Sequence, residues 1–355
     1  MVRLEVLKRL CEAFGPPGFE EEVVSIVKEE YSGFADRYSR DGLGSIVLER
    51  AGDPEGPRVL LAGHADEIGF IVTGIDEKGY LHFRPLGGWA PVTLPGHRVL
   101  VRTKKGPLIG VVTMKPPHLL PPEERKKAPE IKDLYIDVGA SSREEAREAG
   151  VRIGDPVAPV SEFREMLGGR RIVGKAFDDR LGVFLSMETL REVGGATPNR
   201  LFAAATVQEE VGLRGAETVA DLVNPDVCIV LEVDIAGDVP GVTEREAPAK
   251  MGKGVSIVTW DRTMIPNQAL KEFVVETAEE ENIPYQLSAV SGGTDAHRIH
   301  LHYTGVPSIV LGVPTRHIHS HNSIASVSDV EAALRLVCAV VKKLDGRTVE
   351  SFRYR

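Results

Sequence analysis

The sequence is poor in cysteine and has no long apolar run. Its three cysteines, Cys11, Cys228 and Cys338, form no CxxC pair, and their number is odd. We therefore expect no disulfide framework and a reducing compartment. No apolar stretch reaches the ~18 residues that a membrane-spanning helix needs, and the charged N-terminus lacks an apolar signal core. These absences predict a cytoplasmic protein without a membrane partner.

Positive charge is also in deficit. The 355 residues include 43 Lys and Arg against 52 Asp and Glu, which gives a formal net charge of −9. This balance argues against a nucleic-acid partner bound through its phosphates. With 42% hydrophobic and 27% charged residues the composition is that of a globular protein, and the length favours two structural units.

The first part of the chain predicts two helices followed by a buried strand. Apolar residues recur at helical spacing over residues 4–11, and a second amphipathic run covers residues 20–31. The apolar run at residues 58–63 predicts a strand that ends directly at His64.

The character of the sequence changes between residues 68 and 160. Only a charged stretch at residues 142–150 has a helical pattern there, and the proline-rich segment 115–122 predicts a long loop. Short β-like runs alternate with Gly and Pro, at residues 68–75, 80–83, 98–103, 108–114 and 156–160. We predict a small β-barrel or sandwich, residues 68–160, inserted into a domain made of residues 1–67 and 161–355.

After residue 174, strand and helix patterns alternate. A last helix is expected from Ser328, because Ser328 and Glu331 have the spacing of a capping box. The other predicted helices are residues 181–193, 213–223 and 268–282, and the predicted strands are residues 201–207, 227–231, 255–260 and 308–312. This alternation predicts an α/β fold with a mixed sheet covered by helices on both sides.

Acidic and histidine side chains follow several of the predicted strands. His64, the pair Glu209-Glu210 and Glu232 each come just after one, and ligands of α/β sheets collect at the carboxyl ends of strands. Imidazoles and carboxylates are the ligands that divalent metals such as zinc, cobalt or manganese accept. Each piece alone is weak evidence, but their joint occurrence indicates a metal-dependent hydrolase. Of the doubled glutamates, one could hold metal and the other could move protons.

Two further acidic residues have competing interpretations. Asp178 precedes an amphipathic helix, so it is either a helix N-cap or a carboxylate that bridges two metals, and Asp179 competes for both roles. Asp66 lies two residues after His64, so in an extended segment the two side chains point the same way. We expect Asp66 to accept the second imidazole N–H and fix the tautomer of His64.

Taken together, these residues closely resemble the M42 family of metalloaminopeptidases, which includes the tetrahedral (TET) aminopeptidases. The matching stretches occur in the family's order and lie between about residue 60 and residue 330: Gly63-His64-Ala65-Asp66-Glu67-Ile68-Gly69, Lys175-Ala176-Phe177-Asp178-Asp179-Arg180, Val207-Gln208-Glu209-Glu210-Val211-Gly212, Ile235-Ala236-Gly237-Asp238-Val239-Pro240-Gly241, Gly292-Gly293-Thr294-Asp295-Ala296 and Ile318-His319-Ser320.

The resemblance implies a fold, a metal site and an assembly. The fold is a catalytic α/β domain with an inserted β-rich dimerisation domain. The implied site would hold two divalent cations, Zn²⁺ or Co²⁺, bridged by Asp178, with Glu209 as general base and acid. His64 and Glu232 would complete one metal site, and Glu210 and His319 the other. The resemblance also implies dimers that assemble into a twelve-subunit tetrahedral shell, and short peptide substrates that lose their N-terminal residues.

Some positions stay open at this point. The family commonly has Asp where this chain has Glu232, and Asp234 lies close by. His317 and His321 flank His319, and alternation along an extended segment would place all three on one side. The family's Ile-His-Ser pattern favours His319. The preferred N-terminal residue of the substrate is also open.

Two other functions are compatible with parts of the pattern. Glu209 and Asp178 could form the carboxylate pair of a glycan hydrolase that needs no metal. That interpretation leaves His64 and His319 unexplained. The chain could also be a metal-binding scaffold without activity, but structural metal sites are closed and usually richer in cysteine.

Overall fold

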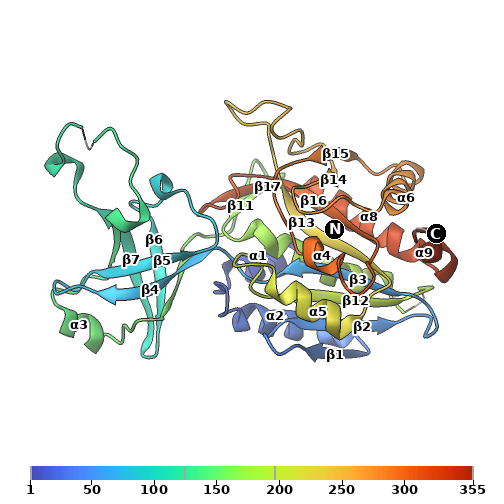
Figure 1. Ribbon diagram of the computed structural model, residues 1–355, viewed down its shortest axis with the longest axis horizontal. Helices are drawn as coiled ribbons and strands as arrows, with labels where there is room; N and C mark the ends of the chain where they lie inside the picture. The colour runs from blue at the N-terminus through green and yellow to red at the C-terminus, as the bar shows by residue number, and fades with distance from the viewer. Residues whose placement is uncertain (1, 124, 196, 354–355) are drawn as a thin grey trace.

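The computed structural model describes residues 2–353 except residues 124 and 196. It consists of a main α/β body and a smaller β-barrel beside it (Figure 1). This confirms the predicted fold class, a mixed sheet flanked by helices with an inserted barrel. None of the helices that the structure describes is long and apolar enough to cross a membrane.

The main body is built on a mixed sheet with a parallel centre, in which β12, β3, β13 and β16 lie side by side. The order is β1-β2-β12-β3-β13-β16-β17-β11-β10, and β14 pairs with β16 and β15. The strands are β1 (Arg37–Arg40), β2 (Ile46–Ala51), β3 (Arg58–His64), β10 (Arg164–Met166), β11 (Arg171–Gly174), β12 (Arg200–Thr206), β13 (Val227–Ile235), β14 (Val255–Trp260), β15 (Tyr285–Ala289), β16 (Ser308–Arg316) and β17 (Ser323–Ser326).

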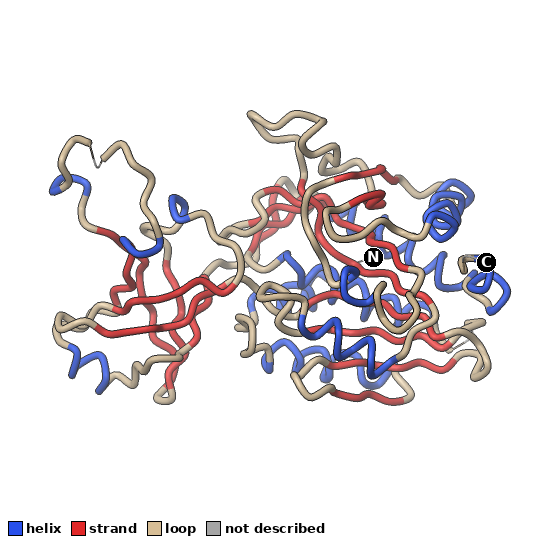
Figure 2. The backbone as a smooth tube through the Cα atoms, viewed as in Figure 1, coloured by secondary structure: helices blue, strands red, loops and turns tan. Residues whose placement is uncertain are grey.

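Helices cover both faces of this sheet (Figure 2). The larger apolar core joins one face to α1 (Leu4–Glu12), α2 (Glu21–Tyr31), α4 (Phe177–Val193), α6 (Gln268–Glu280), α8 (Val327–Lys343) and α9 (Gly346–Ser351). The smaller core joins the other face to α5 (Arg214–Val223) and α7 (Ala296–Ile299). The central strands are buried on both faces, which explains why they read as continuous apolar runs in the sequence.

The inserted unit is a closed antiparallel barrel in the order β4-β5-β8-β7-β6-β9. Closure pairs every strand and leaves no open edge. Its strands are β4 (Gly69–Ile75), β5 (Leu81–Leu86), β6 (Arg98–Thr103), β7 (Gly106–Met114), β8 (Leu134–Asp137) and β9 (Pro156–Pro159), with α3 (Arg143–Glu148) between β8 and β9. Short 3-10 turns lie at Ser32–Phe34, Pro91–Thr93, Pro117–Leu119 and Ile131–Asp133. The proline-rich segment 115–122 contains one of these turns and otherwise forms loop.

The predicted start of the last helix is wrong. Helix α8 begins at Val327, and its N-cap residue is Ser326, whose side chain makes no capping hydrogen bond. Ser328 therefore lies inside the first turn and forms no capping box. The carboxylate of Asp329 is used differently, since it accepts hydrogen bonds from the backbone N–H groups of Gly252 and Gly254.

Candidate metal centre

The strand register brings the predicted donors to one edge of the sheet. On β3 and β12, His64 pairs with Thr206, so the loop that carries Glu209 starts beside His64. On β13, Val230 pairs with Ala62 of β3, which places Glu232, two residues later, at the level of His64. The structure thus brings these distant residues together at one edge of the sheet, as predicted.

Asp178 lies at the centre of the donors, with one carboxylate oxygen facing each of two imidazoles. His64 Nε2 lies 3.0 Å from Asp178 Oδ1, and His319 Nε2 lies 3.2 Å from Asp178 Oδ2. Beyond these contacts, Glu232 Oε2 is 3.8 Å from His64 Nε2, and Glu210 Oε1 is 3.5 Å from His319 Nε2. Three triplets of possible ligands result, and the donor atoms within each lie within 4.8 Å of one another: His64–Asp178–Glu232, Asp178–Glu210–His319 and His64–Glu209–Glu210.

The electrostatics of these clustered carboxylates favour bound cations. Burial raises the pKa of Glu232 and of Glu209 well above the usual range, and burial together with the charge of Asp178 raises that of Glu210 to about 8. Burial opposes ionisation of Asp178 too, but hydrogen bonds from His319 and His64 override it and lower its pKa. Glu210 Oε1 is buried and accepts no hydrogen bond from the described residues. Crowded carboxylates of this kind are stabilised by a bound metal ion.

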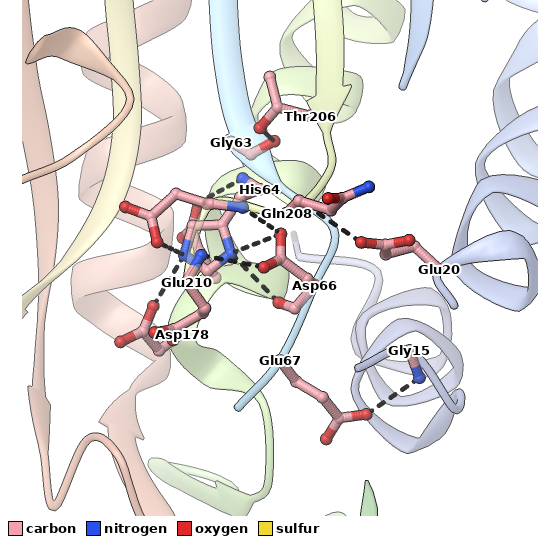
Figure 3. Close-up of polar contacts among 12 residues, drawn as sticks. Gly15, Glu20, Gly63, His64, Asp66, Glu67, Asp178, Thr206, Gln208 and Glu210 are labelled. Atoms are coloured by element: carbon pink, nitrogen blue, oxygen red, sulfur yellow. Dashed lines mark hydrogen bonds and ion pairs between the residues drawn. The ribbon is translucent and has the colours of Figure 1, made fainter. Parts of the chain in front are cut away.

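The side chain of Asp66 lies beside His64 and Glu210 (Figure 3) and orients the glutamate pair more directly than it orients His64. Its two carboxylate oxygens accept the backbone N–H groups of Glu209 and Glu210 at 2.9 and 3.0 Å. The Nδ1 atom of His64 lies 3.1 Å from the main-chain carbonyl oxygen of Asp66 and 3.6 Å from its carboxylate. The main-chain oxygen is therefore the nearer acceptor for the second imidazole N–H, which differs from the predicted carboxylate contact.

The competition between Asp178 and Asp179 is resolved by the backbone at the start of α4. Both residues have non-helical backbone angles, so neither side chain follows the helix surface. Asp179 accepts the backbone N–H of Gly182 at 2.9 Å with one oxygen and that of His64 at 3.0 Å with the other. Asp179 thus caps the helix and ties it to β3, which leaves Asp178 for the donor group.

Asp234 does not join the donor group. Its carboxylate accepts a hydrogen bond from Ser256 Oγ at 2.5 Å, whereas Glu232 belongs to one of the triplets. The prediction that His317, His319 and His321 share one side is wrong. His317 and His319 have positive φ angles of 62° and 54°, so the segment is not extended. His317 is exposed, and the buried ring of His321 stacks on that of His97 with 3.8 Å between centroids.

The remaining histidines with described side chains lie outside the donor triplets. Three of them, which follow the Gly292-Gly293 segment, contact other groups: His297 Nδ1 lies near the Thr263 carbonyl oxygen, His300 Nδ1 near that of Ala296, and His302 Nδ1 near the carboxylate of Asp221. Their peripheral placement agrees with the sequence, in which they carry no ligand spacing.

The sequence and the fold both match known aminopeptidases. A model of the M42 glutamyl aminopeptidase family matches residues 44–336. The chain is 33% identical to the glutamyl aminopeptidase of Lactococcus lactis (99% of each chain covered) and 34% identical to the lysyl aminopeptidase of Pyrococcus furiosus (97% and 98% covered).

Solved structures extend this comparison. The TET aminopeptidase of a marine sediment archaeon, Thaumarchaeota archaeon SCGC AB-539-E09, is 54% identical and superposes with a TM-score of 0.97 over 99% of each chain. The TET1 peptidase of Pyrococcus horikoshii, described as assembling into a tetrahedron or a large octahedral shell, is 32% identical with a TM-score of 0.85 over 96% and 99%. A Thermotoga maritima protein described as an endoglucanase is 32% identical with a TM-score of 0.80 over 98% and 99%.

Proposed function

The chain belongs to the M42 family of aminopeptidases and is a hydrolase of that class, and on this premise we propose that it removes N-terminal residues from short peptides with two divalent cations. His64, Asp178 and Glu232 would hold one cation, and Asp178, Glu210 and His319 the other. The observation that carries this proposal is the central carboxylate of Asp178, whose two oxygens face different imidazoles.

Zinc or cobalt fits this mixed set of carboxylates and imidazoles. When bound, such a cation pair lowers the pKa of a water molecule and polarises the scissile carbonyl group. This effect is stronger at the His64–Asp178–Glu232 triplet, in which His64 and Glu232 are buried, because a water-poor site screens charge weakly.

Glu209 is the residue that we assign to proton transfer. It is buried, and its Oε2 atom lies 3.8 Å from His64 Nε2. Glu209 also groups with His64 and Glu210, but the two triplets that share Asp178 are complete without it. The raised pKa of Glu209 suits a group that accepts a proton from the attacking water and then delivers it to the leaving amine nitrogen.

The test is the pair of variants Glu209→Gln and Asp178→Asn, each measured for turnover and for metal content. We expect Glu209→Gln to lose at least about a hundredfold in turnover, the usual contribution of a general base, while it keeps two metal ions per chain. Asp178→Asn should lose metal as well as activity. A Glu209→Gln variant that binds one ion fewer would identify Glu209 as a ligand and contradict this assignment.

The assembly implied by the family is part of the proposal. We infer that the chain forms homo-oligomers built from dimers in which the inserted barrel, residues 68–160, takes part. The assembly of the Pyrococcus horikoshii TET1 peptidase into a tetrahedron or a large octahedral shell supports this inference. Such a shell would limit the substrates of this chain to short peptides. Analytical ultracentrifugation that finds only monomers at micromolar concentration would refute it.

The endoglucanase name carried by one relative makes glycan hydrolysis the alternative worth testing. A glycosidase that uses Glu209 and Asp178 would need no metal, and its activity would survive chelation. We expect the opposite: full loss of aminopeptidase activity in a chelator, recovery on addition of Zn²⁺ or Co²⁺, and no release of reducing sugar from cellulose at any stage.

A further inference from the structure

A cavity of about 430 Å³ extends from the metal donors across the face of β13, β16 and β14. The register explains its apolar floor. Val258 of β14 pairs with Val310 of β16, and Val310 pairs with Val230 of β13, two residues before Glu232. Side chains two residues apart on a strand share a face, so Val258 and Val310 lie on the face of the sheet that carries Glu232. Val290 is a third apolar residue that lines the cavity.

Asp261 also lines this cavity, directly after the end of β14. Its side chain is only 3% exposed. One carboxylate oxygen, Oδ1, accepts the backbone N–H groups of Thr263 and Met264 and the hydroxyl of Thr263. The other, Oδ2, is buried and receives no hydrogen bond from the part of the chain that the structure describes. A buried charged oxygen without a donor is unfavourable, so this position favours an occupant that donates.

The charge of the cavity wall selects against acidic occupants. Among its described lining residues there is no Lys or Arg, and two carboxylates, Asp234 and Asp261, lie outside the donor triplets. A substrate carboxylate placed here would lose water without gaining a basic partner. An aliphatic chain that ends in a positive charge, by contrast, matches both the valine floor and the free oxygen of Asp261.

We propose that this cavity receives the side chain of the substrate's N-terminal residue and that Asp261 makes it selective for a long basic residue, lysine or arginine. The proposal rests on the proposed aminopeptidase function. Val258, Val290 and Val310 contact the methylene groups of the substrate side chain, and Asp261 Oδ2 accepts a hydrogen bond from its ammonium or guanidinium group. The two relatives named for glutamyl and lysyl substrates are almost equally similar in sequence, so the preference is decided by the lining of the cavity and not by overall identity.

The experiment compares substrates that differ only in the terminal charge. Lysyl-, norleucyl- and glutamyl-p-nitroanilide are offered to the metal-loaded protein, because norleucine has an unbranched alkyl chain like that of lysine but no ammonium group. The same panel is run on Asp261→Asn, which keeps the size of the side chain and the Oδ1 acceptor. Glu217→Gln, which removes one negative charge from the exposed surface of α5, is the matched control.

We expect the wild-type protein to have a kcat/KM for the lysyl substrate at least about tenfold above that for the norleucyl substrate, the effect of one charge-assisted hydrogen bond. The glutamyl substrate should be the poorest. In Asp261→Asn the lysyl-to-norleucyl ratio should fall at least about tenfold with little change for norleucyl, and Glu217→Gln should keep the wild-type ratio.

Several outcomes would overturn the proposal. A wild-type preference for the glutamyl or the norleucyl substrate would do so by itself, even if Asp261→Asn failed to fold. Equal losses for both substrates in Asp261→Asn would show that Asp261 only supports the loop. If wild-type protein with added metal cleaved none of the three substrates, the proposed aminopeptidase function would fail instead, so the two failures are distinct.

Discussion

A buried ion cluster beneath the metal donors offers a sharp test of how the site is supported. Lys175 Nζ lies 2.6 and 2.7 Å from the two carboxylate oxygens of Glu67 and 3.0 Å from the carbonyl oxygen of Ala13. Arg180 lies 3.5 Å from the same carboxylate. Glu67 follows Asp66, and Lys175 precedes Asp178 by three residues, so the cluster connects two segments that carry the metal centre to the N-terminal helices.

We predict that Lys175→Met destabilises the protein strongly. Removing one partner of a buried ion pair costs about 3–5 kcal/mol, because the other charge stays buried. Because Glu67 keeps its contact with Arg180, we expect the loss in the free energy of unfolding to lie near the lower end of this range, at about 3 kcal/mol. For a chain of 355 residues a loss of that magnitude lowers Tm by roughly 4 °C. The assay is scanning calorimetry on metal-free protein at fixed concentration, so that metal binding and assembly do not shift Tm.

Two further variants make this prediction refutable. Lys250 pairs with Glu244 at the surface, so Lys250→Met should change stability far less than Lys175→Met. The double variant Lys175→Met with Glu67→Gln should recover part of the loss, since it leaves no carboxylate without its ammonium partner. If Lys175→Met unfolds at the same temperature as Lys250→Met, the cluster does not stabilise the fold and the reasoning is wrong.

Two other predictions concern contacts around the site. Burial raises the pKa of Glu20 to about 7, above the ordinary value of 4.5, so ionisation disfavours the folded state and stability is lost as pH rises from about 4.5 to 7. Glu20→Gln can still accept the backbone N–H of Gln208 but cannot ionise, so the Tm of the variant minus that of the wild type should increase between pH 5 and pH 8. A Tm difference that stays constant over this pH range would contradict the prediction. Gly88→Ala would place a Cβ atom 3.0 Å from His319 Nδ1 and so displace this imidazole. We expect the metal content, measured by mass spectrometry, to fall from two ions per chain towards one. Two tightly bound ions in this variant would refute the role of the contact.

The sequence predicts most of the centre because the central strands carry a strong local signal. Strands β3, β12 and β13 are buried on both faces, so each contains an uninterrupted apolar run. His64 ends β3 and the Glu209-Glu210 pair follows β12, whereas Glu232 lies inside β13, which continues to Ile235 beyond the predicted strand end at residue 231. Edge strands lack that signal. All four residues of β1 are exposed, and no apolar pattern marks it.

The errors arise where tertiary contacts or special backbone angles decide the outcome. The positive φ angles of His317 and His319 break the alternation that was predicted for the histidine segment. The capping box expected at Ser328 does not form, because β17 runs directly into α8 and makes Ser326 the N-cap. The importance of Asp261 depends on the pairing of β14 with β16, more than 50 residues away in sequence, which no local pattern reveals.

The inserted barrel is a structural part of the metal centre as well as a separate unit. The carbonyl oxygen of Gly88, in the loop after β5, lies 2.9 Å from His319 Nδ1, which leaves Nε2 of that ring for Asp178 and Glu210. The buried ring of His321 stacks on His97 of the barrel, so the histidine segment is held from that side. Because a ligating imidazole needs its second nitrogen fixed to keep its tautomer and orientation, a main body without the barrel would lack a fixed His319. A rearrangement of the barrel would therefore reach His319 through this main-chain contact.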